Sequence, residues 1–395
     1  MTTPPFHLAI ALEGTGWHPA SWREPGAHAD EVLTADFWID QVREAEAALA
    51  DLVTFEDAFA LPGDGRTDRR QGRLDAILTA VRVGPVTRHI GLVPTVVATH
   101  TEPFHVSTEI ATLDYVSTGR AGLRIKVSAD AAEAALFGRR DAAHEDRESL
   151  FDEAADHVEV QRRLWDSWED DAEIRDASTG RFVDREKLHY IDFVGPHFAV
   201  RGPSITPRPP QGQPVVTALA HIDTAYRLAA READLVFVTP DGHGHHGPIG
   251  DAATVLAEVR GIEREVGREV PLHVFGDLLV LLDDTAEAAL ERRRRLDAAA
   301  FTEPGRELRS DARILAGTAS DVADVLESWH DAGLTGVRLR PAVAAHDLPR
   351  ITRDLVPELQ RRGLHRTAYE TAPDGTSTLR GLLGLARPAD RYARV

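Results

Sequence analysis

The sequence predicts a (β/α)8 barrel, an α/β fold in which eight parallel strands are each followed by a helix of an outer ring. Strand-like and helix-like segments alternate along the chain, and eight segments are typical of strands. In addition, residues 90–128 have the pattern of a strand, a helix and a second strand. Two strands joined in this way lie parallel with a right-handed crossover, so this stretch is one repeat of the barrel.

The stretch 90–128 can be divided from its residue types. Residues 90–99 are rich in Val and Thr, which suit a pleated, buried surface. Pro103 is placed to begin a helix, where its missing N–H is harmless. Gly119 ends that helix, and residues 120–128 are again extended.

The other elements follow in chain order around this unit. Short apolar runs predict the remaining strands, at residues 6–12, 51–57, 214–220, 234–240, 270–282 and 335–343. Apolar side chains spaced for one helical face predict the helices, at residues 36–50, 74–83, 147–168, 223–233, 248–266, 320–332 and 348–362. Ser320 is expected to cap its helix. Residues 129–143 fit neither pattern.

A chain of 395 residues is longer than the about 250 that a barrel needs, so we expect insertions. Residues 169–213, after the fourth helix, are acidic and then proline-rich, and so long a segment without periodicity indicates a lid or insertion. Residues 284–300 form an extra helix after strand seven. We expect one barrel domain at residues 1–370 and an irregular tail at residues 371–395.

Composition excludes several classes of protein. The net charge of -19 argues against nucleic acid or an anionic membrane as a partner. The chain has no Cys, which rules out disulfides, thiolate catalysis and Cys metal sites and fits a reducing cytoplasm. No signal peptide is visible at the amino terminus, and no apolar run reaches the roughly 18 residues of a membrane helix. A cytoplasmic location is therefore expected.

Candidate site residues are those at the carboxyl ends of the strands, where barrel enzymes place their chemistry. Arg124, Lys126 and Ser128 alternate along the fourth strand and therefore face one way. If that way is inward, the two cations need partners, which Asp57 or Glu13 could supply. They could equally hold an anionic substrate or a phosphate. A buried structural ion pair is the alternative.

A histidine-rich loop follows the sixth strand, in the sequence DGHGHHG. Its glycines match a dinucleotide fingerprint, but the bulky histidines and the surrounding barrel repeats argue against that interpretation. Three imidazoles without a carboxylate at fixed spacing do not predict a metal site, although a metal-dependent enzyme stays open as an alternative. We expect a flexible loop from which His243 reaches the substrate as an acid or base.

Long matches carry a resemblance to a known family. TLDYVSTGRAG at residues 112–122, LWDSWEDDA at residues 164–172 and HFAVRGPSITPRPPQGQPVV at residues 197–216 resemble bacterial luciferase-like flavin monooxygenases. The nearest branch contains nitrilotriacetate monooxygenase, pristinamycin synthase and dibenzothiophene-sulfone monooxygenase. The resemblance covers roughly residues 6–361. It implies a (β/α)8 barrel whose members use reduced FMN and O2.

The resemblance also suggests roles for individual residues. An acidic residue at the position of Asp57 lies close to the flavin in the family, although a loop cap is equally open. Thr95 falls where hydroxyls approach the isoalloxazine ring, with a barrel-filling residue as the alternative. Ser128 is also assigned to the cofactor. Trp17 and Trp22 belong to an aromatic loop after the first strand, and we assign them, with Lys126, to the substrate.

Two departures from the family pattern stand out. Arg124 replaces an Asn that commonly contacts flavin, and we assign it a catalytic role at the ring or substrate. At the end of strand five, the Ser and Gly that hold the FMN phosphate are replaced by Ile222 and Ala225. Asp223 adds a negative charge there, and a phosphate-binding Tyr becomes Phe151. His221 is assigned a catalytic role and is also expected to supply part of the lost contact, with a plain helix-start residue as the alternative.

The resemblance therefore predicts a two-component flavin-dependent monooxygenase. A separate flavin reductase would supply reduced FMN, and one oxygen atom of O2 would enter a small organic substrate. A homodimer is expected from the family. One alternative is an F420-dependent oxidoreductase with the same barrel. Another is a flavin-poor, non-catalytic paralogue that serves as a binding or partner protein, which the altered phosphate region motivates.

Overall fold

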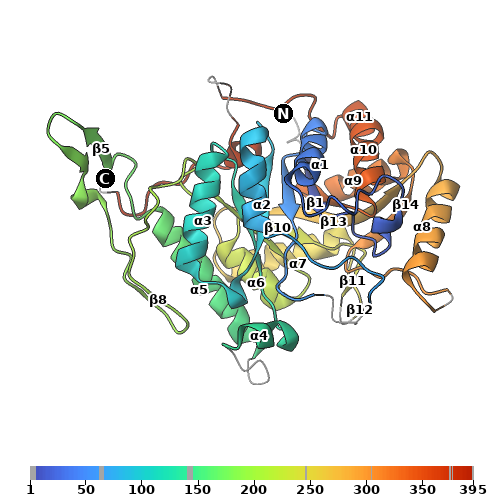
Figure 1. Cartoon of the computed structure of the whole chain (residues 1–395), viewed down its shortest axis with the longest axis horizontal. Coiled ribbons are helices and arrows are strands. Elements are labelled where there is room, and N and C mark those ends of the chain that lie inside the picture. Colours follow the sequence, from blue (N-terminus) through green and yellow to red (C-terminus); the bar gives the residue numbers. More distant parts are fainter. Residues whose placement is uncertain are drawn as a thin grey trace.

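Eight parallel strands close into a barrel in the computed structural model (Figure 1). In their order around the barrel they are β1 (His7–Leu12), β2 (Leu52–Phe55), β3 (Gly91–Val97), β4 (Gly122–Lys126), β9 (Val215–Leu219), β10 (Leu235–Val238), β13 (His273–Leu282) and β15 (Gly336–Pro341). Pairing of β15 with β1 completes the ring. The predicted barrel is confirmed. The structure describes residues 6–61, 66–139, 146–244, 247–303, 305–372, 375 and 377–393.

Helices surround this barrel, as predicted. They are α1 (Ala35–Ala47), α2 (Ala76–Val83), α3 (Pro103–Val116), α5 (Arg147–Trp165), α6 (Asp223–Glu232), α7 (Ala252–Glu265), α9 (Ala319–Asp331), α10 (Ala344–Arg350) and α11 (Val356–Arg361). Further helices are α4 (Ala131–Phe137), α8 (Ala286–Ala300) and α12 (Leu379–Leu382). Thr318, not Ser320, caps α9, because its hydroxyl accepts the N–H of Asp321. None of the described helices is long and apolar enough to cross a membrane.

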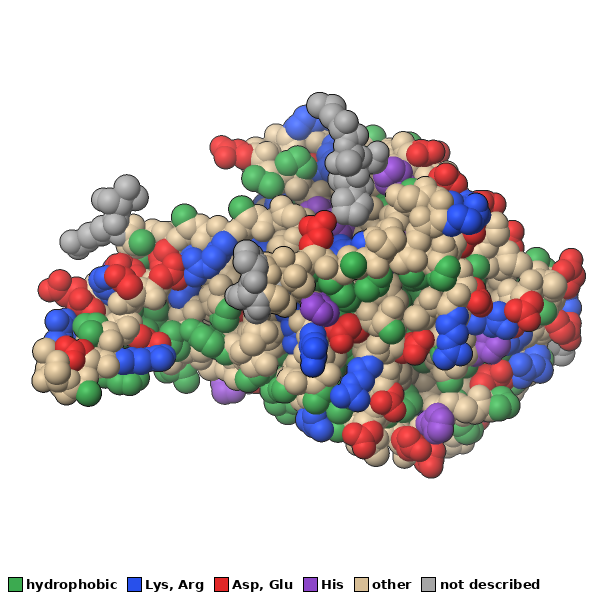
Figure 2. All heavy atoms as spheres, turned by 90° about the horizontal axis from the view of Figure 1, so that it is seen from above, with side chains coloured by type: hydrophobic (Ala, Val, Ile, Leu, Met, Phe, Trp, Pro, Cys, Tyr) green, Lys and Arg blue, Asp and Glu red, His purple; other side chains and the backbone are tan. Residues whose placement is uncertain are grey.

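The insertion after α5 projects from one side of the barrel (Figure 1), and Figure 2 shows the same extension from above. It forms two hairpins, β5 (Glu173–Asp176) with β6 (Arg181–Val183) and β7 (Phe193–Val194) with β8 (Ala199–Val200). Phe193 packs against Val160 and Leu164 of α5, and Arg208 pairs with Asp166 just beyond that helix. The described contacts place the segment beside α5, while its role as a lid and the domain division at residue 370 stay predictions.

A strand that the sequence did not predict, β14 (Arg313–Gly317), pairs with the outer half of β13. It lies outside the closed ring, because β13 is long enough to pair with β10, β15 and β14 in turn. Four of its five residues are only half-buried. A strand of this kind shows neither a buried apolar run nor a clear alternation, which explains why the sequence pattern missed it.

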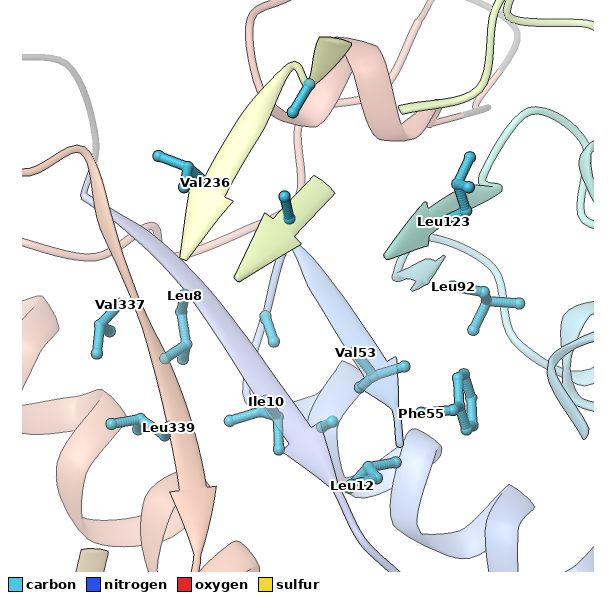
Figure 3. Close-up of a cluster of buried hydrophobic side chains, with 14 of the residues drawn as sticks. Leu8, Ile10, Leu12, Val53, Phe55, Leu92, Leu123, Val236, Val337 and Leu339 are labelled. Carbon is cyan, nitrogen blue, oxygen red and sulfur yellow. The ribbon is translucent and has the colours of Figure 1, made fainter. Parts of the chain in front are cut away.

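Alternation along the barrel strands separates an apolar outer layer from a mixed interior. Leu8, Ile10 and Leu12 of β1 point to the surrounding helices, beside Val337 and Leu339 of β15 (Figure 3). These five side chains are buried. Each such burial contributes roughly 1.5–3 kcal/mol. The intervening positions of each strand face into the barrel, and they decide what the interior can bind.

The tail was expected to be irregular, and this prediction is wrong at α12, whose Leu379 closes the amino-terminal end of the barrel. Leu379 is fully buried against Val93 and Val215. Gly91 and Gly122 leave the space for it, since a Cβ atom at these positions would come 2.4 and 3.1 Å from its methyl groups. A helix of four residues is too short to produce a periodic pattern in the sequence.

Replacing Leu379 with Ala should lower the free energy of unfolding by about 2–5 kcal/mol, because it leaves a cavity at the floor of the barrel. Leu136→Ala, at an exposed position of α4, is the matched control. Urea denaturation of both variants measures the difference. Equal midpoints for Leu379→Ala and the control would mean that the tail does not stabilise the barrel.

Two buried histidines make the stability of the fold depend on pH. Burial lowers the pKa of His157, on α5, to about 3. Burial and the neighbouring His7 lower the pKa of His273, at the start of β13, to about 4. Both groups stay neutral in the folded protein at pH values where the unfolded chain binds a proton. Their contribution to stability is therefore complete above the ordinary pKa of 6.5 and is lost as the pH falls toward the folded values.

His157→Gln should flatten the fall in stability between pH 6 and pH 4 by about 1.4 kcal/mol per pH unit. The measurement is a series of urea denaturation curves across this pH range. His105→Gln, at an exposed position on α3, should leave the slope as in the wild type. An unchanged slope in His157→Gln would show that this imidazole is already protonated in the folded protein.

Candidate active site

Charged side chains fill the half of the barrel interior that leads to the carboxyl ends of the strands. Inward positions of β4 and β15 supply arginines, and inward positions near β2 and β13 supply carboxylates. A third carboxylate comes from the segment before β14. The members of this charged layer are Arg124, Arg338, Arg340, Glu56, Asp277 and Asp311. All three arginines are buried, so each needs a partner inside the protein.

Asp277 is the centre of the charged layer. Its carboxylate accepts hydrogen bonds from Arg338 at 2.7 and 2.5 Å and also binds Arg340. Arg340 continues the chain of ion pairs to Asp311, with N–O distances of 2.6 and 3.1 Å. Aromatic rings stack on two of these cations, since Arg338 lies 4.1 Å from the centre of the Phe237 ring and Arg340 lies 4.6 Å from that of Trp17. The arginines are thus fixed by forked hydrogen bonds and stacking.

Arg124 faces inward, as the alternation allowed, but its partner is Glu56 and neither of the carboxylates expected from the sequence. The guanidinium also donates to the Thr95 hydroxyl at 3.0 and 2.9 Å. Thr95 and Arg124 are register partners on β3 and β4, which explains this contact. Glu13 instead binds Arg70 at 2.5 Å.

Lys126 also faces inward, two residues nearer the carboxyl end of β4 than Arg124. Its ammonium donates to the backbone carbonyl of Asp57 at 2.9 Å. Burial and the positive charge of Arg124 lower the pKa of Lys126. In contrast, burial alone would raise the pKa of Asp311, but Arg340 beside it holds that pKa well below its usual range. The formal charges of the three arginines and three carboxylates cancel, so Lys126 adds positive charge to the site.

A cavity of ≈ 380 Å³ lies at this layer, and we call it the inner cavity. Five of the residues predicted from the sequence line it, namely Trp17, Arg124, Lys126, His221 and Ile222. The indole N–H of Trp17 donates to the carbonyl of Ala11 at 2.9 Å, and Arg340 lies 4.6 Å above its ring. Arg147 and Phe151 of α5 form another part of the wall.

A second cavity, of ≈ 940 Å³, adjoins the first, and we call it the outer cavity. His221 and Asp311 line both cavities, so the two spaces meet at these side chains. His243, predicted as a substrate residue, lies in the wall of the outer cavity. The rest of this wall comes from Asp241 and Gly244 beside His243, from α8, and from residues 308–314, which include the start of β14.

Five predicted residues do not line either cavity, and one of them is Thr95, whose hydroxyl accepts from Arg124 as described above. The carboxylate of Asp57 accepts the N–H groups of Ala58 and Ala76 at 2.8 and 3.0 Å, so it ties its loop to the start of α2. Burial raises the pKa of Asp57. The Ser128 hydroxyl donates to Glu133 of α4.

The remaining two lie nearer the surface. Trp22 donates its indole N–H to the carbonyl of Asp68 at 3.3 Å. Asp223, at the start of α6, is more than half exposed and pairs with Arg227 at 2.7 Å. Arg227 therefore balances the negative charge that was expected to repel a phosphate.

The histidine loop forms part of a short hairpin, β11 (His243–Gly244) with β12 (Gly247–Pro248). His245 and His246 lie outside the described residues. Within the parts of the chain that the structure describes, no group of three His, Cys, Asp or Glu side chains is arranged to hold a metal ion.

Several residues of the site were not found from the sequence. Asp277 is the one charged residue between Val274 and Leu282, and its inward position could have identified it. Asp311 gave no signal, because it lies in a polar segment before a strand that was not predicted. Arg338 and Arg340 lie in the last predicted strand, 335–343, on the side where barrel enzymes place their chemistry. The sequence could not pair them with carboxylates, because tertiary register decides the partners.

Comparisons with known proteins identify the family of the chain. The family model of luciferase-like monooxygenases matches residues 17–336. The chain belongs to this family. It is 30% identical to nitrilotriacetate monooxygenase component A of Aminobacter aminovorans, over 98% of each protein. It is 29% identical, also over 98% of each, to N-acetyl-S-(2-succino)cysteine monooxygenase of Bacillus subtilis. The luciferase-like monooxygenase is therefore an oxidoreductase, and its relatives support flavin-dependent monooxygenation.

Solved structures share the barrel. DmoA from Hyphomicrobium sulfonivorans superposes with a TM-score of 0.84 at 22% identity and covers 98% of this chain and 93% of its own. Riboflavin lyase, solved with modified FMN and riboflavin, gives a TM-score of 0.82 at 23% identity and covers 96% of each chain. At these identities the likeness shows the fold, and it confirms the luciferase-like class of barrel.

Asp277→Asn should destabilise this luciferase-like monooxygenase by about 3–5 kcal/mol, because two buried arginines lose the charge between them. Asp223→Asn is the control, since it breaks an exposed ion pair and should leave the free energy of unfolding nearly unchanged. Chemical denaturation followed by circular dichroism measures both. A loss in Asp277→Asn no greater than in the control would show that the charged layer does not depend on this carboxylate.

Proposed function

We propose that the protein is the oxygenating component of a two-component monooxygenase that takes reduced FMN from a separate flavin reductase. O2 is the second substrate, and one of its oxygen atoms enters a small organic molecule. The inner cavity carries this proposal. It combines the volume of a small-ligand site, an aromatic wall and an excess of positive charge at the carboxyl end of a luciferase-like barrel.

The residues present fit an anionic flavin. Four cationic side chains and two carboxylates line the inner cavity, so the lining has a formal charge of +2; they are Arg124, Lys126, Arg147, Arg340, Glu56 and Asp311. A phosphate dianion is complementary to this excess. Apolar side chains of β4, α5 and α6 offer the surface that a flat ring system needs.

The phosphate end belongs, in this proposal, near the start of α6. Ile222 precedes that helix and provides no side-chain capping bond, so the helix amino terminus retains donors for an anion. The helix dipole favours a negative charge there. Lys126 and Arg147, which line the same cavity, would supply the cations. They would replace the Ser and Gly that the family places on this turn.

Bound reduced FMN supplies the two electrons that activate O2, and the chain's own residues prepare the site. Trp17, fixed by its bond to Ala11, gives the ring an ordered aromatic neighbour. The charged layer forms a rigid floor, because its guanidinium groups are already hydrogen-bonded to carboxylates of the protein. His221, where the two cavities meet, is placed to move a proton between its imidazole and a substrate atom.

The need for a partner is supported by relatives whose names describe one part of an assembly. Nitrilotriacetate monooxygenase component A is one such relative, and another is one of the two polypeptides of pristinamycin IIA synthase from Streptomyces pristinaespiralis. A flavin reductase is the partner that this chemistry requires. A homodimer and a cytoplasmic location stay predictions from the sequence.

The altered phosphate region favours two other outcomes that binding can separate. F420 has a different tail, and F420-dependent secondary alcohol dehydrogenase shares the barrel with a TM-score of 0.60 at 14% identity. A flavin-poor paralogue would bind neither cofactor. Both alternatives rest on Ile222, which stands at the start of α6 where the family has a phosphate-binding Ser.

Reduced FMN should bind the wild type, and Lys126→Ala and Arg147→Ala should each weaken binding by about tenfold or more, because each removes a charge-assisted contact. Riboflavin, which lacks the phosphate, should bind all three proteins equally. Arg231→Ala removes an exposed cation at the far end of α6 and is the control. Anaerobic fluorescence titration measures the dissociation constants.

Other outcomes of this titration would contradict the proposed function or the proposed position of FMN. Preference for F420 over reduced FMN would assign the protein to the deazaflavin enzymes. Failure to bind any flavin would remove the catalytic proposal. If both variants bound FMN and riboflavin as the wild type does, FMN would lie elsewhere on the barrel.

A further inference from the structure

We propose, on the basis of the function proposed above, that the outer cavity is the substrate site and that the substrate is an organic anion with two or more carboxylates. The location follows from the two shared side chains. His221 and Asp311 line both cavities, so a ligand in the outer cavity lies next to one in the inner cavity. The outer cavity therefore has the position that a substrate must occupy.

Arginines from three segments surround the outer cavity. Arg293 comes from α8, Arg309 from the loop before β14, and Arg313 from β14 itself. Guanidinium groups bind carboxylates through two parallel hydrogen bonds. Because the three groups come from separate segments, they suit a ligand that carries more than one anionic group.

Carboxylates of the protein do not cancel these cations completely. Asp311 is held by Arg340 from the charged layer, and Asp241 pairs with Arg313 at 3.3 Å. Arg293 pairs with Glu307, whose side chain is 69% exposed, and with the buried Asp297 at 3.7 Å. Arg309 is itself exposed, and among the described residues it has no ion-pair partner.

The charge of this cavity opposes that of the whole molecule. The chain carries a net charge of -19, and acidic and basic side chains lie intermingled on the face shown in Figure 2. In the outer cavity, three arginines face two carboxylates. A protein that repels anions overall needs such a local excess in order to bind one.

The walls that hold the arginines are fixed and partly apolar. The N–H of His243 donates to the carbonyl of Asp311 at 3.0 Å, which joins the loop after β10 to the segment before β14. Gly242 lies so close that a Cβ atom would come 2.0 Å from the same carbonyl. Leu308 and Ile314 offer apolar surface for the carbon skeleton of a ligand.

Calorimetric titration with propane-1,2,3-tricarboxylate tests this site without turnover. The wild type should bind it, bind its neutral triamide at least about tenfold more weakly, and lose affinity as salt rises. Arg309→Ala should weaken binding by about tenfold or more, and Arg309→Lys should restore part of the loss. Arg294 is next to Arg293 in the sequence, but its side chain is 68% exposed and pairs with Glu291. The control variant Arg294→Ala should therefore bind the tricarboxylate as the wild type does.

Equal binding of the tricarboxylate and the triamide, or equal loss in Arg309→Ala and Arg294→Ala, would overturn the inference. Inorganic phosphate is a further probe, and binding as tight as the tricarboxylate with the same dependence on Arg309 would reject carboxylates as the ligand class. Reduced FMN binding, measured on the same variants, should not change. A protein that binds the tricarboxylate but no flavin would contradict the proposed function alone, and the reverse result would contradict this inference alone.

Discussion

The ion pairs around Asp277 are the interaction on which the site depends. Arginines buried inside a barrel are tolerated only where carboxylates meet them at hydrogen-bond distance. Asp277 provides this for Arg338 and Arg340, and Glu56 provides it for Arg124. Because the partners come from different strands, the closed register of the barrel decides their pairing. The layer then forms the charged floor of the inner cavity.

Below this floor the interior has the opposite character. Leu379 of the tail, with Val93, Val215 and Phe237, fills the amino-terminal half with apolar side chains. The barrel is therefore closed by apolar side chains at one end and charged toward the other. This polarity gives each charged group a single direction in which it can meet solvent or a ligand. It also explains why a tail of low sequence regularity is needed to complete the core.

The sequence predicted what local patterns control and missed what distant contacts control. Alternation predicted that Arg124 and Lys126 share a face, and the strand-end rule pointed to the correct side of the barrel. The pairing of Arg124 with Glu56 could not be predicted, because it depends on register across β2, β3 and β4. Asp311 lies before a half-buried strand that shows no pattern, so neither its position nor its contact with Arg340 was visible.

The changes at α6 and the arginines of the two cavities share one physical feature, because both rely on charged side chains for binding anions. The family fixes phosphate with a hydroxyl and with backbone donors that a Gly leaves accessible, which need no net charge. Here Ile222 removes the hydroxyl, while Lys126 and Arg147 add charge on the same cavity. Side-chain cations act over a longer range than hydrogen bonds, and salt weakens them. In the proposed site, such cations would draw two anionic ligands into adjoining cavities of a strongly acidic protein, while the arginines of the neutral charged layer would stay bound to their own carboxylates.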